Sequence, residues 1–453
     1  MIEHTDYRLA LIIPHSRQLL GIPGSGAVEL PVVSIPQRER PAEQLTIQIE
    51  ERWNIKTIVL DILEGSGSKA PCAVIEVRTS SWDFECEGFC TVQPDKIGDA
   101  LLADSQRRSL RTILQGTNVD GFAFSRIGWI EDAQLWIQSS VTDHRVIFSG
   151  DIRQLNGGGA FCLLRLGTQT GAAYWIKGVG EPNVHEFAVT GYLAKHCPDY
   201  LPGVVAMRSD WNAWTMEEFG SSLHHSDSLD DFKRAVYRLA GLQMQLTGKS
   251  DELLAAQCAD HRTRVLNSHI DDIIEYLDGA MHRQTSAKAL PLSSSRLHEI
   301  RTTLHDACFA LEDLRIPDSI MHGDISPGSI LGNGNTCVFT DWCEACVGCP
   351  FITFEQLCVH AARKAGESES WIGSLKRIYR SCWIDFLTEH QIDRALQIVP
   401  LVSVLSYLCG RGEWLHASQR NEPAFLSHSR SLARHMDRIA RNIELTGALC
   451  ERS

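Results

Sequence analysis

The sequence predicts an α+β protein in which a small strand-rich lobe precedes a large helical lobe, with a further α+β module at the N-terminus. Short apolar runs separated by turn residues fill residues 144–220. From Leu229 onward, apolar residues recur with helical spacing almost throughout. At 453 residues the chain is too long for one ordinary core. We therefore expect an N-terminal domain over 1–115, a helical linker over 116–143, the strand-rich lobe over 144–220 and the helical lobe over 221–453.

The N-terminal module is predicted to combine strands with amphipathic helices. Leu45, Ile49 and Trp53 fall on one helical face, which is the pattern of a helix packed on a sheet. The expected strands are Arg8–Ile13, Gln18–Ile22, Thr57–Ile62 and Ala73–Val77, and the expected helices are Glu43–Trp53, Ile97–Leu114 and Trp129–Val141. In the strand-rich lobe one helix, Val184–His196, is expected among the strands Arg145–Phe148, Phe161–Leu166, Ala172–Ile176, Val204–Met207 and Trp214–Glu217.

The composition is that of a globular protein, since 43% of the residues are hydrophobic and 22% are charged. The net charge of −13 disfavours broad binding to nucleic acid. We find no apolar run that reaches the ~18 residues of a membrane span. The first residues lack the basic start and the small-residue cleavage site of a signal peptide. We therefore expect a cytoplasmic protein with no nucleic-acid or membrane partner, whose 15 cysteines are mostly reduced.

Two aspartates in the second half of the chain carry the main chemical signal. Asp324 lies in Met321–Leu331, MHGDISPGSIL, a loop rich in glycine and proline that lets the backbone approach a ligand. Asp341 follows an apolar run, where a carboxylate is costly unless it is paired or binds a metal. Phosphoryl transfer from a nucleotide needs one carboxylate beside the attacking hydroxyl and another on Mg²⁺. The alternative is a turn aspartate and a helix-capping aspartate.

A lysine and a glutamate in the strand-rich lobe form a second pair of candidates. Lys177 ends an apolar strand that begins at Ala172, and Glu186 lies in the helix that follows. In kinases, a strand lysine paired with a helix glutamate positions the phosphates of the nucleotide. The alternative is an exposed lysine at a strand end and a solvated glutamate. The order Lys177, Glu186, Asp324, Asp341 along the chain favours the phosphate-binding interpretation.

These motifs resemble those of a known family. HGDISPGSIL followed by VFTDW is similar to the aminoglycoside phosphotransferase and choline kinase-like family, in which H-G-D-x-x-x-x-N precedes an I-D-W-type strand. The segment from Glu344 to Phe351 also looks like the family's continuation, and the resemblance covers residues 144–453. It implies a two-lobed protein kinase-like fold that uses ATP and Mg²⁺ and phosphorylates a hydroxyl of a small molecule. It also implies that Asp324 is the catalytic base or orienter, and that Asp341 is a metal ligand.

The same resemblance identifies the segment 214–220 as the hinge between the two lobes. In such a hinge the backbone of an extended segment bonds the adenine ring. Met216 and Glu217 are then the residues expected beside the nucleotide base. An ordinary edge strand would show the same local pattern, so the flanking motifs carry this assignment.

A glycine-rich segment precedes the candidate lysine. Gly157 and Gly158 lie in the run NGGG at 156–159, between two predicted strands, so their N–H groups could face the phosphates of the nucleotide. The run does not match G-x-G-x-x-G, and a flexible hairpin turn accounts for it equally well.

Two positions depart from the family's pattern. Ser329 stands where the family has the asparagine that helps to hold the metal, and a serine hydroxyl binds Mg²⁺ more weakly and with a shorter reach. Thr353 occupies a position where many relatives carry an acidic residue. Two functions therefore stay open. One is an active kinase whose metal is held by Asp341 and Ser329, and the other is a nucleotide-binding pseudokinase that acts as a sensor or scaffold.

The segment Leu30–Ile55 can be aligned without gaps with the Nudix signature, but the acidic residues of that signature are missing. Only Glu51 remains, while Pro36 and Arg52 replace two of the others. A single carboxylate cannot hold a diphosphate-bound Mg²⁺. The resemblance therefore implies a degenerate Nudix-like α/β/α domain without hydrolysis. Such a module could serve as a docking domain, as a regulatory domain, or as a dimerisation domain that joins two copies of the chain in a homodimer.

Two weaker signals lie in the helical lobe. Trp371, Trp383 and Trp414 either line the acceptor site or pack in the core. The cysteines of the segment 343–349 have the C-x2-C-x2-C spacing of iron–sulfur ligands, but the fourth cysteine is absent. Three small buried or half-buried thiols are the simpler interpretation of that segment.

Overall fold

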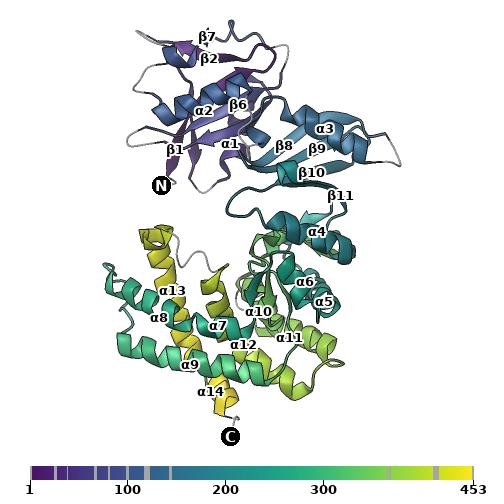
Figure 1. Cartoon of the computed structure of the whole chain (residues 1–453), viewed down its shortest axis with the longest axis vertical. Coiled ribbons are helices and arrows are strands. Elements are labelled where there is room, and N and C mark those ends of the chain that lie inside the picture. Colours follow the sequence, from purple (N-terminus) through teal and green to yellow (C-terminus); the bar gives the residue numbers. More distant parts are fainter. Residues whose placement is uncertain are drawn as a thin grey trace. The chain divides into compact units, whose positions relative to one another are not determined.

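The computed structural model describes residues 3–24, 28–37, 39–65, 69–79, 82–97, 101–116, 123–141, 145–364, 366, 369–411 and 418–450. The chain forms two compact units, which Figure 1 shows coloured along the sequence. The first unit comprises residues 1–187 and 203–218, and the second comprises residues 188–202 and 219–453.

A seven-stranded mixed sheet forms the N-terminal part of the first unit. β1 is parallel to β6 on one side, and on its other side it pairs with β4 and then with β2, both antiparallel. The strand order is β3-β2-β1-β6-β5, with β7 on β2. The seven strands are β1 (His4–Ile13), β2 (Gln18–Pro23), β3 (Val28–Glu29), β4 (Val32–Pro36), β5 (Thr57–Leu63), β6 (Cys72–Val77) and β7 (Cys90–Val92). The four strands expected in this region are confirmed as β1, β2, β5 and β6.

The helices of this part of the chain are α1 (Pro41–Trp53), α2 (Asp104–Gln115) and α3 (Trp129–Ser140). Helix α1 starts with a proline, whose missing N–H is not needed in the first turn. Its predicted face of Leu45, Ile49 and Trp53 is buried against the sheet. The helix expected from Ile97 begins only at Asp104, because the chain first forms a short 3-10 helix at Pro94–Lys96. Residues 98–100 of that expected helix lie outside the described residues.

A five-stranded antiparallel sheet completes the first unit. Its order is β11-β12-β10-β9-β8, and its strands are β8 (Phe148–Gly158), β9 (Phe161–Thr168), β10 (Ala173–Gly178), β11 (Val204–Arg208) and β12 (Ala213–Glu217). Alternate side chains of β10 use its two faces. Tyr174 and Ile176 enter the large core of the unit, whereas Trp175 and Lys177 lie on the opposite face. The residues 145–147, expected as a strand, precede β8 without belonging to it.

One buried core joins the two sheets of the first unit. Leu60 of β5 and Leu164 of β9 belong to the same cluster of buried residues, together with Trp129 and Ile137 of α3. Helix α3, which lies in the region expected as a helical linker, packs in this shared core. Residues 117–122 and 142–143 of the expected linker lie outside the described residues.

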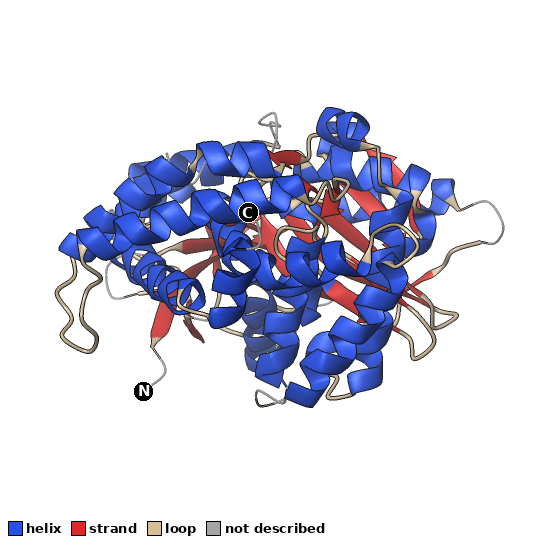
Figure 2. Cartoon of the chain, turned by 90° about the horizontal axis from the view of Figure 1, so that it is seen from below, coloured by secondary structure: helices blue, strands red, loops and turns tan. Residues whose placement is uncertain are grey.

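The second unit is mainly helical, and the chain enters it within α4 (Glu186–His196). The colouring of Figure 2 distinguishes its helices from the strands. The further helices are α5 (Leu229–Gln245), α6 (Ser250–Ala255), α7 (Thr263–Ser268), α8 (Ile270–His282), α9 (Ser294–Asp313), α10 (Phe351–Lys364), α11 (Glu369–Trp383), α12 (Glu389–Cys409), α13 (Pro423–Ala440) and α14 (Ile443–Cys450). Two three-stranded sheets, β13-β16-β17 and β14-β18-β15, consist of β13 (Ser221–Ser222), β14 (Ala259–His261), β15 (Ser319–Met321), β16 (Ile330–Gly332), β17 (Cys337–Phe339) and β18 (Cys346–Gly348).

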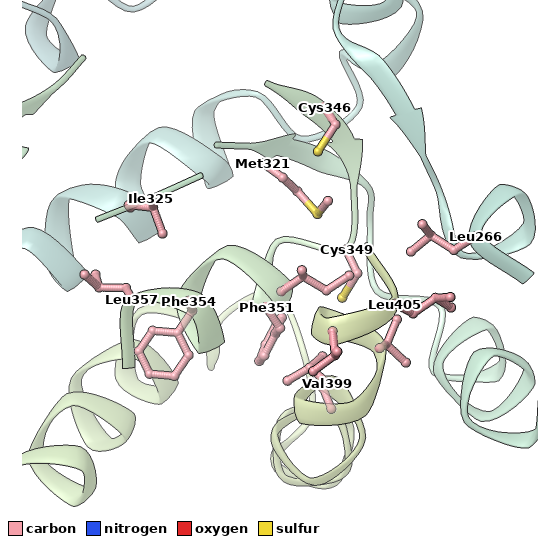
Figure 3. Packing of buried hydrophobic residues seen from close by; sticks show 14 of the residues in the cluster. Leu266, Met321, Ile325, Cys346, Cys349, Phe351, Phe354, Leu357, Val399 and Leu405 are labelled. Atoms are coloured by element: carbon pink, nitrogen blue, oxygen red, sulfur yellow. The ribbon is translucent and has the colours of Figure 1, made fainter. Parts of the chain in front are cut away.

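The core of the second unit lies directly behind the predicted catalytic segment. Figure 3 shows Met321 and Ile325 of that segment among buried side chains that include Phe351 and Phe354 of α10. Cys346 and Cys349 belong to the same core, and burial raises the pKa of the Cys349 thiol to about 12. These two thiols therefore pack as small apolar groups, while Cys343 is half-buried.

Helix α12 is long and apolar enough, by length and composition, to cross a membrane. It is the one such helix among the described residues, and the mean hydropathy of its apolar stretch is 1.4. This differs from our reading of the sequence, which found no such run. Because 72% of that stretch is buried inside the protein, packing in the core of the second unit accounts for its apolar character.

Candidate active site

A buried ion pair joins β10 to α4 in the first unit. Lys177 Nζ lies 2.6 Å from Glu186 Oε1, and the Glu186 side chain is only 1% exposed. The ammonium group also lies 5.6 Å from the ring centroid of Trp214, its neighbour on β12. Removing a charged group from water costs free energy, and the attraction between the two opposite charges offsets this cost. The structure thus brings together the lysine and the glutamate that the sequence predicts as a pair.

Met216 and Glu217 end β12, directly before the chain passes from the first unit to the second. Met216 is buried in a small cluster with Val179 and Trp214. The side chain of Glu217 is exposed, and its backbone N–H donates to the carbonyl oxygen of Gly203 at 2.8 Å. The predicted hinge segment therefore coincides with a crossing of the chain between the two units.

Gly157 and Gly158 lie at the end of β8, and Gly159–Ala160 form the turn that leads to β9. The Gly157 N–H donates to Asn156 Oδ1 at 3.0 Å. A Cβ atom at Gly157 would lie 2.3 Å from Gln154 Nε2, so a larger residue there would displace the Gln154 side chain. The segment forms a hairpin turn between β8 and β9, and its contact with nucleotide phosphates stays a prediction.

The loop that carries Asp324 follows β15 in the second unit. Gly323 has φ = +78°, and a Cβ atom there would lie 2.0 Å from the carbonyl oxygen of Glu344, so only glycine fits. Met321 and Ile325 are each 1% exposed and anchor the loop in the core. Asp324 itself is exposed. The sequence therefore fixes the backbone on both sides of a carboxylate that a ligand can reach.

Asp341 follows β17 in a left-handed conformation, with φ = 63° and ψ = 58°. Thr340 fixes its position. The Thr340 N–H donates to the carbonyl oxygen of Ser329 at 2.9 Å, and the Thr340 carbonyl oxygen lies 2.7 Å from His322 Nε2. Because a carbonyl can only accept, Nε2 of His322 carries the hydrogen. These two hydrogen bonds tie Asp341 to the loop of Asp324.

The charge of Asp341 acts on the carboxylate of Asp324. The pKa of Asp324 is raised, first because its surroundings remove part of its hydration and then because Asp341 is negatively charged. A divalent cation would relieve this repulsion. Among the described residues, no group of three or more histidine, cysteine, aspartate or glutamate side chains could hold a metal ion. A cation at these two aspartates would need further oxygen ligands from phosphates and water, as Mg²⁺ usually has.

Ser329 takes part in the turn that follows Asp324. Its Oγ donates to the carbonyl oxygen of Ser326 and accepts from the Ser326 N–H, both at 3.0 Å, and the residue is 3% exposed. One lone pair of the hydroxyl remains for a metal. Thr353, the second departure from the family's pattern, accepts the backbone N–H of His322 at 3.1 Å. Both residues thus stabilise the backbone of the site.

Tyr407 of α12 is a neighbour of the site that the sequence analysis missed. Its pKa is raised, mainly because it is partly buried and further because Asp324 and Glu344 are negatively charged. The side chain is 46% exposed, and its ring packs edge-on against His428 with 5.9 Å between the centroids. No motif marks this tyrosine, because only the packing of α12 brings it near Asp324.

The tryptophans considered for the acceptor site have other surroundings. Trp383 is fully buried and packs against Phe351 and Tyr379. Trp371 packs against Phe232. Trp414 lies outside the described residues. Core packing thus accounts for the two tryptophans that the structure describes.

The chain was compared with known proteins. No protein-family model matches it, and no curated protein does. Similar solved structures include a choline/ethanolamine kinase family protein from Mesorhizobium loti, with a TM-score of 0.47 and 14% identity over 71% of this chain and 98% of that one. They also include the macrolide 2′-phosphotransferase MphH from Brachybacterium faecium, with a TM-score of 0.45 and 15% identity over 67% of this chain and 97% of that one. The choline kinase from Cryptosporidium parvum has a TM-score of 0.46 and 11% identity over 66% of this chain and 91% of that one. At such identities and TM-scores, these similarities decide neither the family nor the function of this chain.

Proposed function

We propose that the chain transfers the γ-phosphoryl group of ATP to a hydroxyl group of a small molecule. The observation that supports this most is the arrangement of Asp324 and Asp341. Their loops are tied together through Thr340, and the charge of one carboxylate raises the pKa of the other. A base with a raised pKa and a second carboxylate suited to a metal are what phosphoryl transfer needs.

In this proposal, Asp324 orients the acceptor hydroxyl and takes its proton. The hydroxyl oxygen forms a bond to the γ-phosphorus, the bond from that phosphorus to the β–γ bridging oxygen breaks, and ADP leaves. Asp341 would hold Mg²⁺, with Ser329 as a weaker additional ligand. When bound, Mg²⁺ supplies positive charge to the phosphate oxygens. In this proposal Tyr407 lies on the acceptor side, because the charge of Asp324 raises its pKa and the residue is partly exposed.

The first unit contributes the nucleotide-binding residues in this proposal. Lys177 contacts the phosphates, and Glu186 fixes the direction of the lysine side chain. Their 2.6 Å contact supports these roles, because a lysine held in this way presents a fixed positive charge. Met216 and Glu217 lie beside the adenine.

A second candidate function is a nucleotide-binding pseudokinase that acts as a sensor or scaffold. The observation that favours it is the hydroxyl of Ser329, which already makes two hydrogen bonds within its own turn. Such a hydroxyl is a weaker metal ligand than the amide it replaces in the family that the motif resembles. In this case the chain would bind ATP but turn it over very slowly.

For the N-terminal module we propose a Nudix-like fold without hydrolysis. Glu51, the acidic residue that remains, is exposed on α1. The guanidinium group of the adjacent Arg52 lies 4.6 Å from the ring centroid of Trp53, and it donates to the carbonyl oxygen of Val32 at 3.2 Å. A single glutamate beside an arginine does not form a Mg²⁺ site.

The experiment that tests the proposal measures binding and turnover separately. Isothermal titration with ATP, with and without Mg²⁺, gives the affinity, and transfer of radiolabelled γ-phosphate to a panel of alcohols, amino alcohols and sugars gives the activity. Asp324→Asn should lose turnover and keep ATP affinity. Asp341→Asn should lose the effect of Mg²⁺ on affinity. Asp385→Asn is the matched control, because Asp385 is an exposed aspartate of the second unit outside the site.

The outcomes separate the candidates. Transfer by the wild-type chain that Asp324→Asn abolishes supports the kinase. Binding of ATP without transfer to any acceptor supports the pseudokinase. Absence of ATP binding by the wild-type chain contradicts both.

A further inference from the structure

The side chain of Gln154 completes the free edge of the N-terminal sheet. β5 is the edge strand of that sheet, and an edge strand exposes unpaired N–H and C=O groups. Val59 of β5 donates its N–H to Gln154 Oε1 at 2.8 Å, and its carbonyl oxygen accepts from Gln154 Nε2 at 2.9 Å. The amide of Gln154 thus replaces the backbone of a neighbouring strand, and it is only 2% exposed. This contact fixes β8 to the N-terminal module.

Asp61, two residues further along β5, holds the glycine turn of the hairpin. Its Oδ1 accepts the N–H of Gly159 at 3.0 Å. The Gly159 carbonyl oxygen accepts the N–H of Phe124 at 3.1 Å, so both backbone groups of this buried glycine are bonded to residues outside the hairpin. A bulge in β5 lies between Val59 and Asp61, the two residues of this strand that contact the hairpin.

The far side of the hairpin adjoins the strand of Lys177. A Cβ atom at Gly180 would lie 2.3 Å from the Cβ atom of Ala160, so the turn of the hairpin packs directly on the residues that follow β10. In the sheet, Lys177 is the partner of Leu163, two residues from the end of the hairpin. The hairpin is therefore supported by Asp61 and Gln154, and it lies next to the proposed phosphate-binding lysine.

An ion pair adds to the contact between the module and β8. Arg153 of β8 donates to Glu43 Oε1 of α1, with Nη2 at 2.7 Å and Nε at 3.1 Å. Figure 1 shows α1 and β8 next to each other in the first unit. The N-terminal module thus contacts the second half of β8, from Arg153 and Gln154 to the turn at Gly159.

From these contacts we infer that Asp61 and Gln154 are positioning residues of the nucleotide site, and that the N-terminal module keeps the glycine hairpin in the conformation that nucleotide phosphates require. This inference rests on the proposed function. It assigns the module a part in nucleotide binding within the same unit, in place of a separate docking or dimerising role. The Asp61 carboxylate acts through the backbone of Gly159 and does not touch the nucleotide.

The opposite interpretation is that Asp61 imitates a phosphate and occupies an N–H that the nucleotide needs. The burial of Gly159 argues against it, because a nucleotide cannot reach this N–H without displacing the module. Ser125 Oγ at 3.4 Å and the backbone N–H of Ile62 at 2.8 Å also donate to the Asp61 carboxylate, so its partners are all structural.

The experiment combines amide hydrogen exchange with nucleotide titration on the full chain. Asp61→Ala removes the acceptor, Asp61→Asn keeps an acceptor oxygen without the charge, and Gln154→Ala removes the link to β5. Asp83→Asn is the matched control, because the hydrogen bonds of Asp83 are confined to its own loop. Exchange in the peptides that cover residues 148–164 is measured without nucleotide, and dissociation constants are measured for Mg²⁺-ATP and for adenosine.

We expect Asp61→Ala and Gln154→Ala to accelerate exchange in the hairpin and to weaken ATP binding by about tenfold, as the loss of one buried hydrogen bond predicts. Adenosine affinity should stay constant, because adenosine has no phosphates. Asp61→Asn and Asp83→Asn should resemble the wild-type chain.

Faster hairpin exchange with unchanged ATP affinity overturns the inference and leaves the proposed function intact. Tighter ATP binding by Asp61→Ala or Asp61→Asn overturns it in favour of phosphate mimicry. If the wild-type chain binds no ATP, the proposed function fails and the inference with it, and the exchange data still show whether the module holds the hairpin.

Discussion

Lys177 donates a hydrogen bond of 2.6 Å to Glu186, and the carboxylate that accepts it is 1% exposed. The pair connects a strand of the five-stranded sheet to the first residue of α4. A buried carboxylate retains its charge only when a partner compensates it. The contact therefore links the stability of the first unit to the residue that we assign to the nucleotide phosphates.

Glu186→Leu should destabilise the protein, because it removes the carboxylate that compensates the largely buried Lys177 ammonium. Breaking a buried ion pair from one side typically costs about 3–5 kcal/mol. The double variant Lys177→Met/Glu186→Leu removes both charges and should regain most of this free energy of unfolding. It should not bind ATP, because the lysine assigned to the phosphates is absent. Urea unfolding of the two variants and the wild-type chain measures the difference. A single variant as stable as the wild-type chain would show that the pair is not coupled to folding.

Asp341 should tolerate asparagine and reject a β-branched residue. Its φ of 63° is a conformation that aspartate and asparagine adopt more readily than other side chains. Asp341→Asn should therefore keep the free energy of unfolding within about 1 kcal/mol, whereas Asp341→Val should lose about 1–2 kcal/mol or more. Both variants should lose the effect of Mg²⁺ on ATP affinity. Equal stability of the two would contradict the conformational argument.

His261 should make the protein less stable at mildly acidic pH. Its ring nitrogens contact Ser406 Oγ at 2.9 Å and the carbonyl oxygen of Gly410, and burial lowers its pKa to about 4 from 6.5. Between pH 6.5 and 4 the unfolded chain binds a proton that the folded chain does not, so the free energy of unfolding falls as the pH falls through this window. The full effect is about 3 kcal/mol. Above pH 6.5 this contribution is constant.

The measurement compares the pH dependence of urea unfolding for the wild-type chain and His261→Gln. The difference between the two curves isolates this histidine from the other titrating groups. We expect the variant to lose less stability between pH 6.5 and 4.5, whatever its stability at neutral pH. Parallel curves would contradict the prediction, because they would show that His261 has the same pKa in the folded and unfolded states.

Tyr407→Ala should weaken binding of the acceptor and leave ATP affinity unchanged, because Tyr407 lies in the second unit within the electrostatic influence of Asp324. Loss of an aromatic contact predicts an increase in the acceptor KM of about tenfold. Tyr237→Ala is the control, since Tyr237 is an exposed tyrosine on another helix of the same unit, α5. A change in ATP affinity with no change in the acceptor KM would contradict this prediction, because it would assign the tyrosine to nucleotide binding.

Several relationships were predictable from the sequence because neighbouring residues determine them. The spacing of Lys177 and Glu186 on a strand and the next helix predicted their contact. The glycine and apolar residues around Asp324 predicted an exposed carboxylate on an anchored loop. Most helices and strands also followed from their apolar periodicity, since the residues that produce it are local.

Other relationships depend on packing between distant segments. The link from Gln154 to Val59 uses a side chain in place of a strand, and a sequence contains no periodic signal for such a contact. The core that the two sheets of the first unit share has no such signal either, because residues far apart in the chain form it. Tyr407 reaches Asp324 only through the packing of α12, which no motif records.

The most direct test of the account is the rate of ADP formation at saturating Mg²⁺-ATP, with an accepted alcohol present, for the wild-type chain and Asp324→Asn. Loss of a catalytic base predicts a rate lower by about 10²–10⁴-fold in the variant, at unchanged ATP affinity. Equal rates in the two proteins would contradict the assignment of Asp324 as the residue that activates the acceptor, and with it the central claim.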